Sequence, residues 1–122
     1  MKTALTRLTQ KHHAYVTDNS KQTLNDGPCV VGDLTVSNPN TAEVWIQLFD
    51  ALATNVTVGS TVPDLSYPCP PGDGTNSSTA VVIGSDSKLQ FDTGCNYAIT
   101  TTRTGSTAPA SDVTVNGQWR KG

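Results

Sequence analysis

The sequence has few charged residues, few aromatic residues and no long apolar run. Of its 122 residues, 15% are charged and 6% are aromatic, and the net charge at pH 7 is −2. Because lysine and arginine are not concentrated anywhere, the chain lacks a footprint for phosphate groups, and nucleic acid is not expected as a partner. No apolar stretch approaches the roughly 18 residues that a membrane span requires, so a membrane is not expected as a partner either.

The sequence also lacks the marks of a secreted protein. Its first ten residues contain no continuous apolar segment and no small-residue cleavage site, so no signal peptide is expected. Cysteine occurs three times, at Cys29, Cys69 and Cys95, an odd number with wide spacing that does not suit a disulfide framework. We expect three reduced thiols packed as small apolar residues in a cytoplasm. One disulfide with one free thiol is the alternative.

Residues with the spacing that catalysis or metal binding needs are scarce. The two histidines, His12 and His13, are adjacent, and adjacent side chains of an extended chain point apart. No CxxC or HxxxH spacing occurs, and Cys69 has no neighbouring cation that would lower its pKa. Scattered aspartates leave calcium binding in loops as a weak alternative. We therefore expect no enzymatic activity, no catalytic residue, no cofactor and no metal site.

Short β-like segments separated by turn signals make up most of the sequence from Gly27 onward. Seven or eight such strands at fairly even spacing predict an all-β fold, an antiparallel β-sandwich of jelly-roll-like or immunoglobulin-like type. The segment 62–74 has four prolines, which exclude a central strand and favour an edge or rim. The expected strands are 29–37, 42–50, 55–59, 78–84, 88–92, 95–103 and 112–119.

The first 26 residues differ from the rest in composition and in hydrophobic pattern. They are polar, with isolated apolar residues, and show no period that predicts a helix or strand beyond one short strand near 14–17. Such a segment cannot bury enough apolar surface to order itself. The sequence predicts two parts: an extended N-terminal arm over residues 1–26, ordered by contact with something else, and a β-sandwich domain over residues 27–122.

The segment "NPNTAEVWIQLFDA" predicts a strand with two apolar faces. One face is aliphatic, with Val44, Ile46 and Leu48. The other face carries Trp45, Gln47 and Phe49. In a sandwich only one face of each sheet is internal, so the aliphatic face is expected in the core and the aromatic face outside. Trp119 also lacks an obvious core partner. Either a loop or the arm of the same chain covers these aromatics, or, as we favour, a neighbouring subunit does.

The order of segments resembles a family of small all-β proteins from tailed-phage structural gene blocks. The resemblance lies in "LTVSNPNTAEVWIQLFDALATNVTVGSTVPDLSYPCPPG" and "KLQFDTGCNYAITTTRTGSTAPASDVTVNG", and it spans roughly Val30 to Gly117 without the arm. Cys69 and Cys95 depart from the small or apolar residues expected there. The resemblance implies a virion component assembled in the bacterial cytoplasm, and it supplies no catalytic residues.

The expected function is that of a non-enzymatic virion structural protein. In this hypothesis a capsid decoration (cement) protein binds and stabilises the shell through its arm and its aromatic outer face. Its partners are the major capsid protein or other virion proteins, and copies associate as dimers or trimers. A neck or tail accessory protein, or a host-surface carbohydrate-binding module, is the alternative. The predicted interface residues are Arg7, Leu8, His13, Tyr15, Trp45, Phe49 and Trp119.

Overall fold

A computed structural model of the protein describes residues 10–16 and 18–122, without the side chains of 85 and 86. This part of the chain forms eight strands and one short 3-10 helix, η1 (Ala53–Asn55). The strands are β1 (Gln10–Val16), β2 (Gln22–Asn25), β3 (Cys29–Asn38), β4 (Val44–Asp50), β5 (Leu65–Cys69), β6 (Ser78–Phe91), β7 (Cys95–Thr100) and β8 (Val113–Lys121). The prediction of an all-β fold is confirmed.

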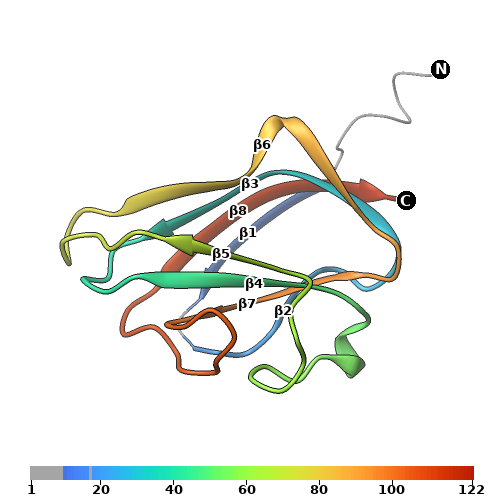
Figure 1. Ribbon diagram of the computed structural model, residues 1–122. Coiled ribbons are helices and arrows are strands. Elements are labelled where there is room, and N and C mark those ends of the chain that lie inside the picture. The colour runs from blue at the N-terminus through green and yellow to red at the C-terminus, as the bar shows by residue number, and fades with distance from the viewer. Residues whose placement is uncertain (1–9, 17) are drawn as a thin grey trace.

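The strands form two four-stranded antiparallel sheets that face each other (Figure 1). The first sheet has the order β1-β8-β3-β6, and the second has the order β2-β7-β4-β5. The pairing is nested: β1 pairs with β8, β2 with β7, β3 with β6, and β4 with β5. The chain therefore crosses from one sheet to the other at every connection except β4–β5 and lies as one long hairpin wrapped around a common core.

The core lies between the sheets and uses the predicted aliphatic face of β4. Val44, Ile46 and Leu48 are at most 1% exposed and belong to one cluster with side chains of β3, β7 and β8. Burying each such side chain contributes about 1.5–3 kcal/mol. All three cysteines are buried and free, as predicted. Burial raises the pKa of the Cys29 thiol to about 11, helped by the nearby charge of Asp50, so the thiol stays protonated and apolar.

Residues 10–16 and 22–25 are strands of the two sheets, so the prediction of an arm over 1–26 is wrong for them. β1 pairs with β8 over its whole length, and β2 pairs with β7. Val16 and Leu24 are buried in the core. The physical reason is that isolated apolar residues suffice when the neighbouring strand supplies the backbone partners and the core already exists. Residues 1–9, with Arg7 and Leu8, lie outside the described residues.

The sequence analysis predicted the edge strands of the sheets only in part. β5 is an edge strand that contains Pro68, as the four prolines of 62–74 predict. The segments 78–84 and 88–92 are not two strands but one long edge strand, β6. A bulge interrupts β6 where Gly32 pairs with Lys88 but Leu34 pairs with Ile83. The predicted strand 55–59 is absent from the described structure, where η1 and a turn take its place.

A hydrogen bond between His12 and Tyr97 joins the two sheets at the β1 edge. The Nε2 atom of His12 lies 2.7 Å from the hydroxyl of Tyr97, and the two rings meet edge to face at 5.4 Å. Tyr97 is fully buried, whereas His12 is half-buried. Burial lowers the pKa of His12 below 6.5, and the neighbouring His13 acts in the same direction.

We expect the free energy of unfolding to fall as the pH drops below about 6.5. The folded state holds His12 with a lowered pKa, so the unfolded state binds the proton first. The stabilisation that comes from keeping His12 neutral is therefore fully present above the pKa of the unfolded state. It is lost as the pH falls through the pKa of the folded state. Urea unfolding of wild type and His12→Gln at several pH values measures this dependence. The free energy of unfolding of the variant should depend less on pH than that of the wild type. His13→Gln removes only the smaller cause of the lowered pKa of His12, so it should reduce the pH dependence less than His12→Gln does. If the free energy of unfolding depended on pH equally in the wild type and in His12→Gln, His12 would not be the cause of the loss of stability at low pH.

Candidate functional site

The outer face of the second sheet is covered by the chain's own loops. Phe49 is 0% exposed and packs against Val56 and Ala98. Gln47 is also 0% exposed, and its Nε2 donates to Thr100 Oγ1 at 2.8 Å and to the carbonyl of Gly105 at 2.9 Å. The favoured expectation, a neighbouring subunit over this face, is therefore wrong for Phe49 and Gln47. The segment after β4 and the loop after β7 fold back across the sheet instead.

The two tryptophans are half-buried and lie in different surroundings. Trp119, on β8, packs against the main core cluster, so the expectation that it lacks a core partner is wrong. Trp45 lies on the outer face of β4 and pairs across the sheet with Thr100 and Pro68. A contact of either tryptophan with a partner stays a prediction.

His13 and Tyr15 lie together on the outer face of β1. Their rings meet edge to face at 4.8 Å, Tyr15 is 67% exposed, and His13 Nδ1 is hydrogen-bonded to the side-chain oxygen of Asn116. A groove of about 400 Å³ is lined by His13 and Asn116, together with Lys11 and Asp33. We call Lys11, His13, Tyr15 and Asn116 the β1 surface. The structure thus brings together two of the seven predicted interface residues.

Asn38 ties together the loops at one end of the sandwich. This side chain is 0% exposed, and its Nδ2 donates to the carbonyls of Ala42 and Pro70, at 3.0 Å each. Its Oδ1 accepts from both the backbone and the side-chain nitrogen of Asn40, at 2.9 Å each. Asn40 in turn donates to the carbonyl of Ser111 and accepts from its backbone nitrogen. Two buried asparagines therefore connect the β3–β4, β5–β6 and β7–β8 loops.

The backbone strengthens the same junction. The amide of Gly72 donates to the carbonyl of Asn40 at 2.7 Å, and that of Gly74 donates to the carbonyl of Pro39 at 2.8 Å. A Cβ on Gly72 would collide with the carbonyl oxygens of Asn38 and Asn76, so only glycine fits there. Hydrogen bonds therefore join the loops at this end into one unit, whose conformation does not depend on a bound ligand.

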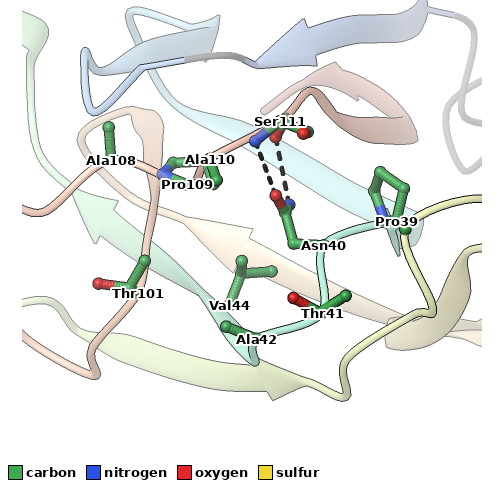
Figure 2. A pocket seen from close by; sticks show the side chains of 11 residues that line it. Pro39, Asn40, Thr41, Ala42, Val44, Thr101, Ala108, Pro109, Ala110 and Ser111 are labelled. Atoms are coloured by element: carbon green, nitrogen blue, oxygen red, sulfur yellow. Dashed lines mark hydrogen bonds between the residues drawn. The ribbon is translucent and has the colours of Figure 1, made fainter.

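These loops line a pocket of about 290 Å³. At one wall of the pocket, two hydrogen bonds join Asn40 to Ser111 (Figure 2). Its lining is mainly apolar, and none of the described lining residues is titratable or aromatic. The pocket suits a small uncharged, apolar group, and its lining offers neither a nucleophile of low pKa nor a general base. The lining residues are Pro39, Asn40, Thr41, Ala42, Val44, Gly74, Thr101, Ala108, Pro109, Ala110 and Ser111.

The sequence interpretation missed this junction. It took "NPNT" as a turn because proline fixes φ and asparagine tolerates turn conformations. The two asparagine side chains also bind loops far away in the sequence: Asn38 donates to the carbonyl of Pro70, 32 residues away, and Asn40 donates to the carbonyl of Ser111, 71 residues away. One signal was available: asparagine at the end of a strand whose alternate residues are apolar must find hydrogen-bond partners when it is buried.

Comparisons with known proteins give no relative. No protein-family model matches the chain, and no curated protein and no solved structure matches it either. Over the described residues, no three His, Cys, Asp or Glu side chains gather to hold a metal ion. In the same part of the chain no helix has the length and apolar character needed to cross a membrane.

Proposed function

We propose that this chain is a non-enzymatic virion structural protein with jelly-roll topology. The observation that carries the proposal is the nested strand order, β1-β8-β3-β6 over β2-β7-β4-β5. Eight-stranded jelly rolls built from two Greek keys are typical of viral capsid proteins, and also of lectins and cupins. The immunoglobulin alternative has less support, because there the first two strands pair in one sheet, whereas here β1 and β2 lie in different sheets.

The β1 surface is the contact region that we propose for the shell. It combines an exposed tyrosine and a histidine with Lys11 and Asn116, an arrangement of aromatic and polar groups that protein interfaces favour. Tyr15 is its most exposed aromatic residue and the residue whose truncation should weaken binding most. The partner is the major capsid protein or another virion protein.

The carbohydrate-binding alternative has weaker support. A sugar site commonly uses aromatic rings as stacking platforms. On the outer face of the second sheet Phe49 is covered by the chain's own loop, and the described lining of the 290 Å³ pocket holds no aromatic ring. Trp45 and Tyr15 do not form one stacking platform, because Trp45 is half-buried on β4 of the second sheet and Tyr15 lies on β1 of the first. Among lectin-like jelly rolls this chain therefore offers little for sugar recognition.

Co-sedimentation with empty shells of the virus that encodes the chain tests the proposal. We expect the wild type to bind and Tyr15→Ala to bind at least about tenfold more weakly, a loss of about 1.4 kcal/mol. Val81→Ala is the matched control, because Val81 is also 67% exposed but lies on β6. Failure of the wild type to bind shells, tails and necks would refute the proposal. Binding only to tails or necks would select the accessory protein instead.

A further inference from the structure

β1 is the one edge strand of the described structure that is regular over its whole length. A long and uninterrupted sheet edge can pair with an extended segment of another chain, and proteins commonly prevent this with short edge strands, prolines or bulges. The other three edges have such protection: β2 has four residues, β5 contains Pro68, and a bulge interrupts β6. β1 pairs with β8 through seven consecutive residues and contains neither a proline nor a bulge.

The free side of β1 has backbone groups that a partner strand could pair with. β1 lies at the end of the order β1-β8-β3-β6 and has β8 as its neighbour in that sheet. In a strand that is paired on one side, about half of the N–H and C=O groups point away from the sheet. Among the described residues, no backbone hydrogen bond from a loop or turn ends on residues 10–16. An added strand would therefore displace no part of the described chain.

The side chains of β1 specify the chemistry of such a strand. Lys11, His13 and Tyr15 alternate with inward-facing residues and lie on the outer face. Directly opposite residues of two antiparallel strands interact, and opposite charges stabilise the pair. β1 contains an exposed lysine and no carboxylate, and Asp33 lies on β3, two strands or about 10 Å away. A partner strand with Asp or Glu opposite Lys11 would therefore supply the missing charge.

We propose that an extended, acidic segment of a shell protein adds to the free edge of β1 as a fifth strand of the first sheet, with a carboxylate opposite Lys11. This inference rests on the proposed function, because the β1 surface is the proposed contact region, and it gives the mode of that contact. In strand addition, main-chain hydrogen bonds supply affinity and alternate side chains supply specificity. A second copy of β1 fits less well, because it has no carboxylate to place opposite Lys11.

Amide hydrogen exchange of the full chain, alone and bound to empty shells, tests the strand pairing. In the free protein, the β1 amides that donate to β8 exchange slowly and those that point away exchange fast. We expect shell binding to slow the fast β1 amides by at least roughly tenfold and to leave the amides of β2 and β6 unchanged. NMR spectra recorded after release from the shells measure each residue. Bound protein with unchanged β1 amides would overturn strand addition and leave shell binding intact, whereas a wild type that binds no virion part would refute both.

A charge reversal tests the acidic character of the partner. We expect Lys11→Glu to bind empty shells at least roughly tenfold more weakly than the wild type, with a smaller dependence on salt. Lys88→Glu is the matched control, because Lys88 is an exposed lysine on β6, the opposite edge of the same sheet. A thermal melt verifies that both variants fold. Equal binding by the two variants would overturn the acidic segment. Purified wild type that dimerises and slows the same β1 amides would assign the edge to a second copy instead.

Discussion

A chain that begins at Gly27 will fail to fold. The deletion removes β1 from the first sheet and β2 from the second, together with the core residues Val16 and Leu24. It also removes one of the two hydrogen-bonded neighbours of β8 and one of the two of β7. Each lost core side chain contributes about 1.5–3 kcal/mol, and the total stability of a domain of this kind is only about 5–15 kcal/mol. Circular dichroism and a thermal melt should show no cooperative transition.

A chain that begins at Gln10 is the matched control, because it keeps every strand of the described structure. It should melt cooperatively and unfold in urea with a dependence on denaturant close to that of the full chain, since the slope follows the surface exposed on unfolding. If the chain from Gly27 unfolded as cooperatively as this control, the first two strands would be dispensable, and the arm hypothesis would return.

The sequence predicted those parts of the fold that depend on local pattern. The alternation of Val44, Ile46 and Leu48 correctly placed one face of β4 in the core, and the prolines correctly placed β5 at an edge. Only the end of β1 was expected, as the short strand near 14–17, and β2 was missed, because few of their residues are apolar. Their order comes from pairing with strands some 70 to 110 residues away, and local propensity carries no record of such partners.

The cover of Phe49 and the loop junction were unpredictable for the same reason. Val56 covers Phe49 from a segment that itself resembles a strand, and the Gly105 carbonyl reaches Gln47 from a loop rich in Thr, Gly and Ser. Nothing within a window of ten residues connects these groups. The sequence did show that Phe49 must be covered, because a small protein does not leave such a face in water, but only the tertiary structure identifies the cover.

Replacing Asn38 by alanine should lower the free energy of unfolding by about 3–5 kcal/mol. The substitution removes four hydrogen bonds at a fully buried position. It leaves the carbonyls of Ala42 and Pro70 and the amide of Asn40 without these partners, and each buried unsatisfied group costs about 1–3 kcal/mol. At about 3–5 °C per kcal/mol for a domain of this size, the melting temperature should fall by roughly 10–20 °C. Differential scanning calorimetry measures both quantities.

Two further variants separate the hydrogen bonds from the side-chain volume. Asn38→Asp keeps the shape but turns a carboxylate oxygen toward the two carbonyls that Nδ2 now serves, so it should destabilise the protein at least as much as alanine does at pH 7. Asn116→Ala, at an exposed position with one hydrogen bond to His13, should change the stability by less than about 1 kcal/mol. If Asn38→Ala and Asn116→Ala had the same melting temperature, the loop junction would have no role in stability.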